Sequence, residues 1–72
     1  MREVTFLNQN SNRWKETEQY LNHTHKADPD KLADLFVQLT DDLAYARTYF
    51  PSSQTTKYLN QLTIQAHQKL YT

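Results

Sequence analysis

The sequence predicts an all-α fold, a three-helix bundle with up-down-up topology. Apolar residues recur at helical spacing in three segments of the chain. The connections between these segments contain proline, serine and aspartate, which stop and start helices. Glycine, which the favoured β-hairpin turns need for positive φ angles, is absent. We therefore expect helices at about 3–25, 29–49 and 53–71, within one domain that spans residues 1–72.

The middle helix has the clearest boundaries. Asp28 can accept hydrogen bonds from the first turn, and Pro29 suits the first helical position. Pro51 forces Phe50 out of helical geometry and ends the helix there. The widest apolar face comprises Leu32, Leu39, Leu43 and Phe50, and a second strip of small residues comprises Ala33, Val37 and Ala44. Two apolar strips suit a middle helix that packs against two neighbours.

The outer helices have weaker signals. The polar stretch 8–12 leaves two alternatives, one continuous first helix or a break with the main helix starting near Ser11. We expect the continuous helix. The third helix should follow a cap at Ser52 or Ser53, and the short connections favour antiparallel neighbours. The expected core contains Trp14, Leu21, Leu35, Leu39, Leu43, Leu62 and Ala66.

Composition excludes several classes of protein. A chain of 72 residues buries only ~60% of its unfolded surface, so its stability should be small. Cysteine is absent, which excludes disulfides and thiolate metal sites. Eight basic and eight acidic residues give zero net charge, which disfavours nucleic-acid binding. No apolar run reaches the ~20 residues of a membrane span, and the start of the chain lacks a signal-peptide core, so we expect a soluble chain.

No catalytic, cofactor-binding or metal site is predicted. His23 and His25 lie two residues apart and point to different sides of a helix, whereas zinc ligands on helices lie three or four apart. Three aspartates of the middle helix lie opposite its apolar face and are interpreted as a solvated acidic surface: Asp34, Asp41 and Asp42. We therefore expect no enzyme activity, no cofactor and no small-molecule substrate.

A possible partner surface comprises Val37, Arg47, Ile64 and Tyr71. Arg47 flanks the apolar face, and the favoured interpretation is an ion pair with Glu16 or Glu18 at the core boundary; the alternative is a partner contact. Ile64 and Tyr71 lie seven residues apart, on the side of the third helix away from its apolar stripe. We expect self-association or a protein partner here.

Several runs of the sequence resemble one known family. They are ADLFVQLTDDLAYARTYFP at 33–51, YLN at 58–60, AHQKLY at 66–71 and, near the start, Phe6 with WKE at 14–16. These runs are similar to the N-terminal region of the stage II sporulation protein M family of bacterial integral membrane proteins. Thr17 stands where the family pattern has an aromatic residue.

The resemblance implies a setting for the domain. It implies that residues 1–72 are the soluble N-terminal part of a longer multi-span protein, on the cytoplasmic face of the bacterial inner membrane. The helical pattern that still runs at residues 70–72 agrees with this expectation. The family namesake works with partner proteins in septal-wall remodelling.

Two function hypotheses follow from the sequence. The first is a non-enzymatic interaction or regulatory domain of a bacterial membrane protein. The second is a free-standing helical adaptor or dimerisation module without a membrane part. An enzyme or metal protein is the weakest hypothesis.

Overall fold

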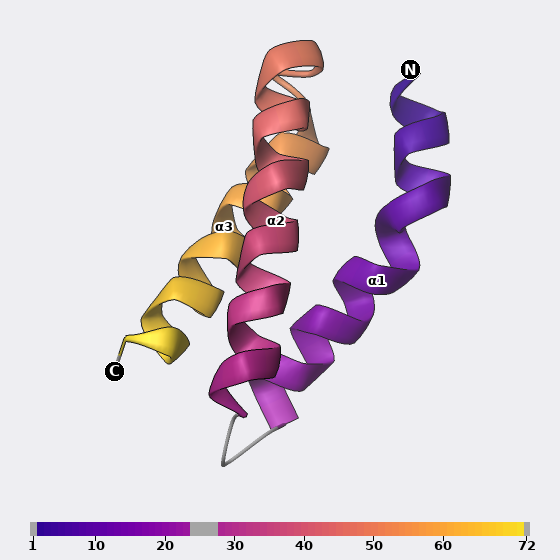
Figure 1. Ribbon diagram of the computed structural model, residues 1–72. Coiled ribbons are helices and arrows are strands. Elements are labelled where there is room, and N and C mark those ends of the chain that lie inside the picture. Colours follow the sequence, from indigo (N-terminus) through magenta and orange to yellow (C-terminus); the bar gives the residue numbers. More distant parts are fainter. Residues whose placement is uncertain (1, 24–27, 72) are drawn as a thin grey trace.

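The structure, a computed structural model, describes residues 2–23 and 28–71 and consists of three helices (Figure 1). They are α1 (Glu3–His23), α2 (Pro29–Tyr49) and α3 (Gln54–Leu70). α1 runs down in Figure 1, α2 runs up and α3 runs down again. The residues described contain no strand. The predicted all-α three-helix bundle is confirmed.

Both ends of α2 form as the sequence predicts. The Asp28 carboxylate accepts a hydrogen bond from the Asp30 N–H at 3.0 Å, and Pro29 is the first helical residue. Phe50, the residue before Pro51, leaves helical geometry, while its N–H still donates to the Ala46 carbonyl at 2.7 Å. α2 is therefore bounded by local chemistry at both ends.

Of the two serines expected to cap α3, the structure uses Ser53. Its hydroxyl accepts from the Thr56 N–H at 3.2 Å. The Thr56 hydroxyl donates to the Phe50 carbonyl at 2.6 Å, which ties the start of α3 to the end of α2. These contacts fix the tight 50–53 connection, so α2 and α3 lie antiparallel.

α1 is one continuous helix through the polar stretch 8–12, as expected, and it bends in its middle (Figure 1). The Asn10 amide donates to the Phe6 carbonyl at 2.9 Å, and the Thr17 hydroxyl donates to the Arg13 carbonyl at 2.9 Å. Side-chain bonds of this kind to the preceding turn often accompany helix bending. The predicted end near 25, with His25, lies outside the described residues.

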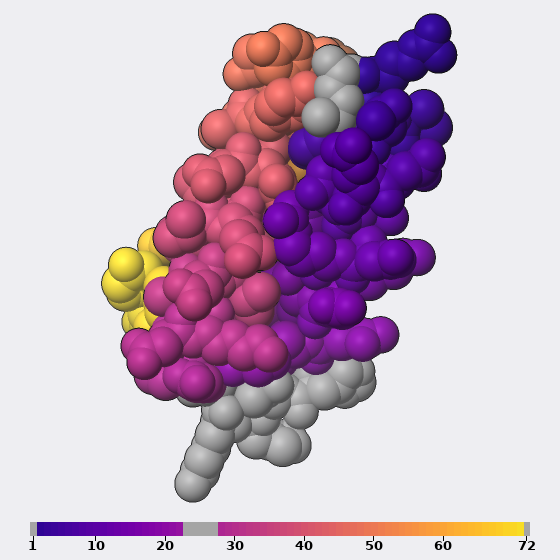
Figure 2. Space-filling model, turned by 45° about the vertical axis from the view of Figure 1, so that its right-hand side comes forward, coloured from indigo at the N-terminus to yellow at the C-terminus, as the bar shows by residue number. Residues whose placement is uncertain are grey.

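α2 and α3 form the closest helix pair. Ala46 and Ala66 are fully buried, and the Thr56 hydroxyl reaches the Ala46 carbonyl at 3.3 Å. Small side chains let two helix axes approach. α1 packs through larger side chains: the Phe6 ring stacks on Tyr45 of α2 with centroids 4.9 Å apart. Figure 2 shows α1 lying along α2, with the yellow end of α3 emerging beyond the opposite edge of α2.

The buried core comprises Phe6, Trp14, Leu21, Leu32, Leu39, Leu43, Ala46, Leu59, Leu62 and Ala66. The prediction that Leu35 belongs to this core is wrong. Leu35 is partly buried and lines a hollow with Tyr20 and Lys31. The second apolar strip of α2 is a further correction, because Val37 stays 57% exposed. α1 and α3 both pack on the wide face of α2, so the strip of small residues has no helix against it among those described.

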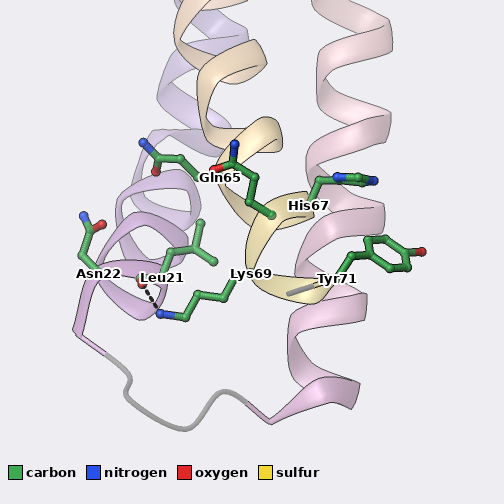
Figure 3. A pocket seen from close by; sticks show the side chains of 7 residues that line it. Leu21, Asn22, Gln65, His67, Lys69 and Tyr71 are labelled. Carbon is green, nitrogen blue, oxygen red and sulfur yellow. Dashed lines mark hydrogen bonds between the residues drawn. The ribbon is translucent and has the colours of Figure 1, made fainter.

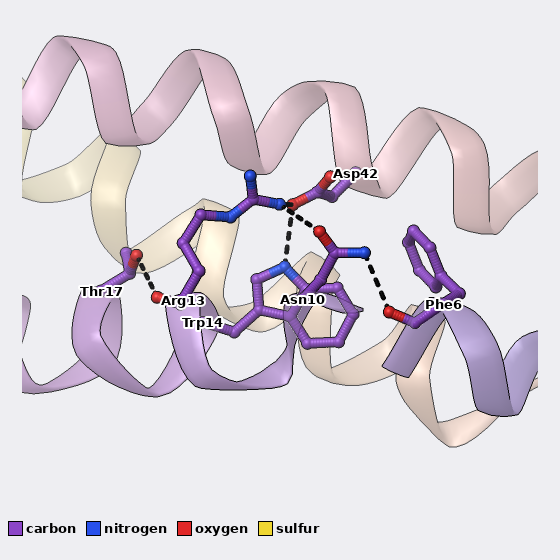
Figure 4. Close-up of polar contacts among 6 residues, drawn as sticks. All are labelled: Phe6, Asn10, Arg13, Trp14, Thr17 and Asp42. Atoms are coloured by element: carbon purple, nitrogen blue, oxygen red, sulfur yellow. Dashed lines mark hydrogen bonds and ion pairs between the residues drawn. The ribbon is translucent and has the colours of Figure 1, made fainter. Parts of the chain in front are cut away.

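Asp42 is not part of a solvated acidic face, and that interpretation is wrong. Its carboxylate accepts hydrogen bonds from the Trp14 indole at 2.8 Å and from Arg13 at 2.5 Å (Figure 4). Arg13 also donates to the Asn10 side chain at 2.8 Å. The Asp42 side chain is only 15% exposed, because it lies on the flank of α2 that faces α1. Burial of Trp14 requires this acceptor.

We predict that Leu39→Ala lowers the free energy of unfolding by about 2–5 kcal/mol, because Leu39 is 1% exposed and its loss leaves a cavity. Urea denaturation measures the change. Val37→Ala is the matched control on the same helix, and a change within about 0.5 kcal/mol is expected for this exposed residue. Equal stabilities of Leu39→Ala and the parent would contradict the packing.

We also predict that Asp42→Ala destabilises by about 1–3 kcal/mol, because the buried Trp14 N–H then lacks its acceptor. The Arg13 contact adds little, since the Arg13 side chain is 40% exposed and screened by solvent. The neighbouring Asp41→Ala serves as control, and it should stay within about 0.5 kcal/mol because Asp41 is exposed. Equal effects of the two substitutions would show that the indole bond contributes nothing.

Candidate functional site

The candidate site is a shallow groove between α2 and α3, which we name the α2–α3 face. It encloses about 340 Å³ and is lined by Phe36, Leu43, Arg47, Asn60, Thr63, Ile64, His67 and Gln68. No residue of α1 contributes to this lining. The α2–α3 face therefore belongs to one helix pair alone.

A chain of ring contacts runs along one end of the face. The rings of Phe36 and His67 have centroids 5.8 Å apart, and those of His67 and Tyr71 are 4.7 Å apart. Tyr71 is the residue that caps α3, four residues after His67, and its N–H donates to the His67 carbonyl at 3.1 Å. Figure 3 shows both projecting to one side of α3, while Lys69 points to the other side and donates to the Leu21 carbonyl at 2.9 Å.

Arg47 lies at the other end of the face, and the predicted ion pair with Glu16 or Glu18 is wrong. Arg47 is exposed and donates to the Asn60 side chain of α3 at 3.1 Å. It lies on the side of α2 that faces α3, so it cannot reach α1. In the described part of the chain the ion pair is Arg13–Asp42, and Arg47 has no carboxylate partner.

The structure brings three of the four predicted surface residues to the α2–α3 face. Arg47 and Ile64 line the groove, and Tyr71 joins it through the His67 ring. Ile64 is 42% exposed and Tyr71 is 72% exposed, so both offer apolar area to solvent. Val37 lies about 100° around α2 from Phe36 and flanks the groove. Val37 is not among the residues that line the groove.

Sequence analysis did not place Phe36, Asn60 or His67 on this surface. For Asn60 and His67 the signal is a second stripe along the third helix, spaced by three or four residues, which comprises Asn60, Ile64, His67 and Tyr71.

The side chains of the α2–α3 face are suited to contact with another molecule. Within residues 2–23 and 28–71 no group of three histidine, cysteine, aspartate or glutamate residues is placed to hold a metal ion. Every buried side-chain nitrogen and oxygen in this part of the chain has a hydrogen-bond partner. Over the same ranges no helix has the length and apolar character to cross a bilayer. What the face presents is exposed apolar and aromatic area beside one guanidinium.

The opposite side of the bundle contains a polar bridge between α1 and α3. The Tyr58 hydroxyl donates to the Glu18 carboxylate at 2.9 Å. Burial raises the pKa of Tyr58 to about 12, with further contributions from the hydrogen bond to Glu18 and from its negative charge. A neutral, protonated Tyr58 therefore joins these helices.

Comparison with known proteins gives a family without a function. A family model described as "Domain of unknown function (DUF8413)" matches residues 4–72. No curated protein and no solved structure matches the chain. The resemblance to the stage II sporulation protein M family stays a prediction.

We predict that the stability of the protein falls as the pH rises from about 10 to about 12, and that Tyr58→Phe reduces this fall. A tyrosine in the unfolded chain loses its proton near pH ~10, whereas folded Tyr58 keeps its proton until about pH 12. The folded state then binds more protons than the unfolded state, so the free energy of unfolding decreases with pH. Urea denaturation across this range tests it, and equal slopes for both proteins would contradict it.

Proposed function

The chain belongs to the DUF8413 family, and we propose that it is a non-enzymatic interaction domain that binds a protein through the α2–α3 face. The observation that carries the proposal is the exposed apolar surface of Ile64 and Tyr71 beside Arg47, which has no carboxylate partner among the described residues.

The residue types of the α2–α3 face suit a protein interface. Tyrosine and arginine are the side chains that most often dominate binding energy, because both combine large contact area with directional polar groups. Here Tyr71 and Arg47 lie at opposite ends of the face with Ile64 between them. An apolar centre between polar or amphipathic ends resembles the usual anatomy of an interface, with a dry core and a wetter rim.

The proposed setting is a bacterial multi-span membrane protein that resembles the stage II sporulation protein M family. The runs at 33–51, 58–60 and 66–71 support it. The domain would then lie on the cytoplasmic face of the inner membrane, ahead of the membrane spans. The alternative is a free-standing adaptor. The reading frame beyond Thr72 separates the two, since the first requires apolar segments of ~20 residues there.

We predict that a photo-reactive phenylalanine analogue in place of Ile64 cross-links the full-length protein to a protein partner in its native cells. The same analogue in place of Asn12, which is exposed on α1, is the matched control. Cross-linked species, resolved by size and identified by mass spectrometry, should form from position 64 and not from position 12. Absence of any protein cross-link from position 64 would contradict a partner surface on the α2–α3 face.

A further inference from the structure

We propose that the partner of the α2–α3 face is an acidic amphipathic helix of another protein, which lies along the groove with carboxylates over Arg47 and Lys57 and apolar side chains over Ile64. This inference rests on the proposed function and specifies the chemistry of the partner. The distribution of charge, the order of side chains along the groove and the packing of α1 on the same helix pair support this partner.

The zero net charge of the chain conceals an uneven distribution. All eight acidic residues lie within residues 1–42, whereas residues 43–72 contain three basic residues and neither aspartate nor glutamate. α3 therefore has no acidic side chain along its whole length. On α2, Asp34 and Asp41 lie more than ~100° around the helix from Arg47. The α2–α3 face is thus cationic, although the chain as a whole is neutral.

Two of the three basic residues, Arg47 and Lys57, lie near one end of the face. Arg47 is exposed, and Asn60 accepts one N–H of its guanidinium at 3.1 Å. Lys57 is also exposed and lies one helical turn before Asn60 on the same stripe of α3. In the described part of the chain neither cation has a carboxylate within ion-pair distance. Both can therefore pair with carboxylates of a partner, and the guanidinium can bind one bidentately.

The charged end of the groove is followed by apolar and aromatic side chains. Arg47 bonds to Asn60, and Ile64 lies four residues further along α3, about 6 Å along the helix axis. His67, whose ring contacts Phe36, follows three residues after Ile64. A partner helix with a carboxylate at the level of Arg47 therefore needs apolar residues about four and about seven positions away, on the same side as the carboxylate.

The opposite side of the same helix pair shows how this chain holds a helix. α1 packs there against both α2 and α3, because the Trp14 indole donates to Asp42 of α2 and its ring centroid lies 6.3 Å from that of Tyr58 on α3. An apolar side chain with a charged contact at its edge thus positions α1. The α2–α3 face offers the same combination with the opposite charge, supplied by Arg47. A partner helix on this face would complete a four-helix arrangement.

The cations of the face are too few for a polyanion. Binding to an anionic membrane takes about four to eight clustered lysines or arginines, and nucleic-acid binding takes a basic patch or stripe. The face presents Arg47 and Lys57 beside the apolar surface of Ile64, which is 42% exposed. Ion pairs at the edge of an apolar contact provide orientation and specificity in a protein interface. The face therefore suits a protein helix better than a phosphate backbone or a lipid surface.

Cross-linking from position 64 of the full-length protein in native cells, with charge reversals added, tests the charge of the partner. We expect Arg47→Glu to lower the yield of the protein cross-link by about tenfold or more, and Lys57→Glu to lower it as well, because each places like charges opposite one another. Lys15→Glu, at an exposed position on α1, is the matched control and should leave the yield unchanged. Thermal melts of the purified variants check that they remain folded, and Lys57→Glu serves alone if Arg47→Glu does not fold.

The cross-linked peptide tests the arrangement. Mass spectrometry should locate the attachment in a segment of the partner that has an aspartate or glutamate about four residues from the attached residue. Replacement of that carboxylate by lysine in the partner should restore the yield with the Arg47→Glu variant, because the exchanged charges attract again.

The outcomes separate this inference from the proposed function. The inference would be overturned by a yield that neither reversal lowers, by a lysine replacement that restores nothing, by a cross-linked segment without a carboxylate within about seven residues, or by a cross-link to a second copy of this chain. The proposed function would survive each of these results, since each includes a protein cross-link from position 64. Capture of only nucleic acid or lipid, or of nothing, would overturn both.

Discussion

The bundle depends on one hydrogen bond, from the buried indole of Trp14 to the carboxylate of Asp42. A small domain gains much of its stability from its largest apolar side chain, but the indole N–H must keep an acceptor when water is excluded. Asp42 supplies the acceptor from α2, and Arg13 balances its charge. This contact fixes how α1 is rotated and which flank of α2 it meets. α3 packs on the same wide face of α2, where the Thr56 hydroxyl ties it to the Phe50 and Ala46 carbonyls.

The asymmetry of the bundle follows from side-chain size. Between α2 and α3 lie Ala46, Ala66 and the Thr56 hydroxyl, so these helices approach closely. α1 is held at greater distance by the rings of Phe6 and Trp14. The tight pair has a groove on the side that α1 does not use, and the contacts that give the groove its shape are short-range ones between α2 and α3. The candidate groove therefore results from the packing of α2 against α3 and does not depend on a loop.

Features that depend only on residues close together in the chain could be predicted from the sequence. The caps at Asp28 and Ser53 and the stop at Phe50 are local chemistry, and six core residues followed from the helical period. Features that depend on how one helix is rotated against another could not be predicted from the sequence. Asp42 and Arg47 lie on opposite flanks of α2, and the period alone could not say that the first meets α1 and the second meets α3. The predictions of a solvated position for Asp42 and of an ion pair with α1 for Arg47 are wrong for that reason.

Among the described residues, no helix packs on the second apolar strip of α2. The strip with Val37 and Ala44 was interpreted as a packing surface for a second neighbour within the chain. Both neighbours instead share the wide face of α2, because the Trp14–Asp42 bond and the Ala46–Thr56 contact draw α1 and α3 to its two flanks. A strip with the spacing and small residues of a helix contact is left facing outward beside Ile64.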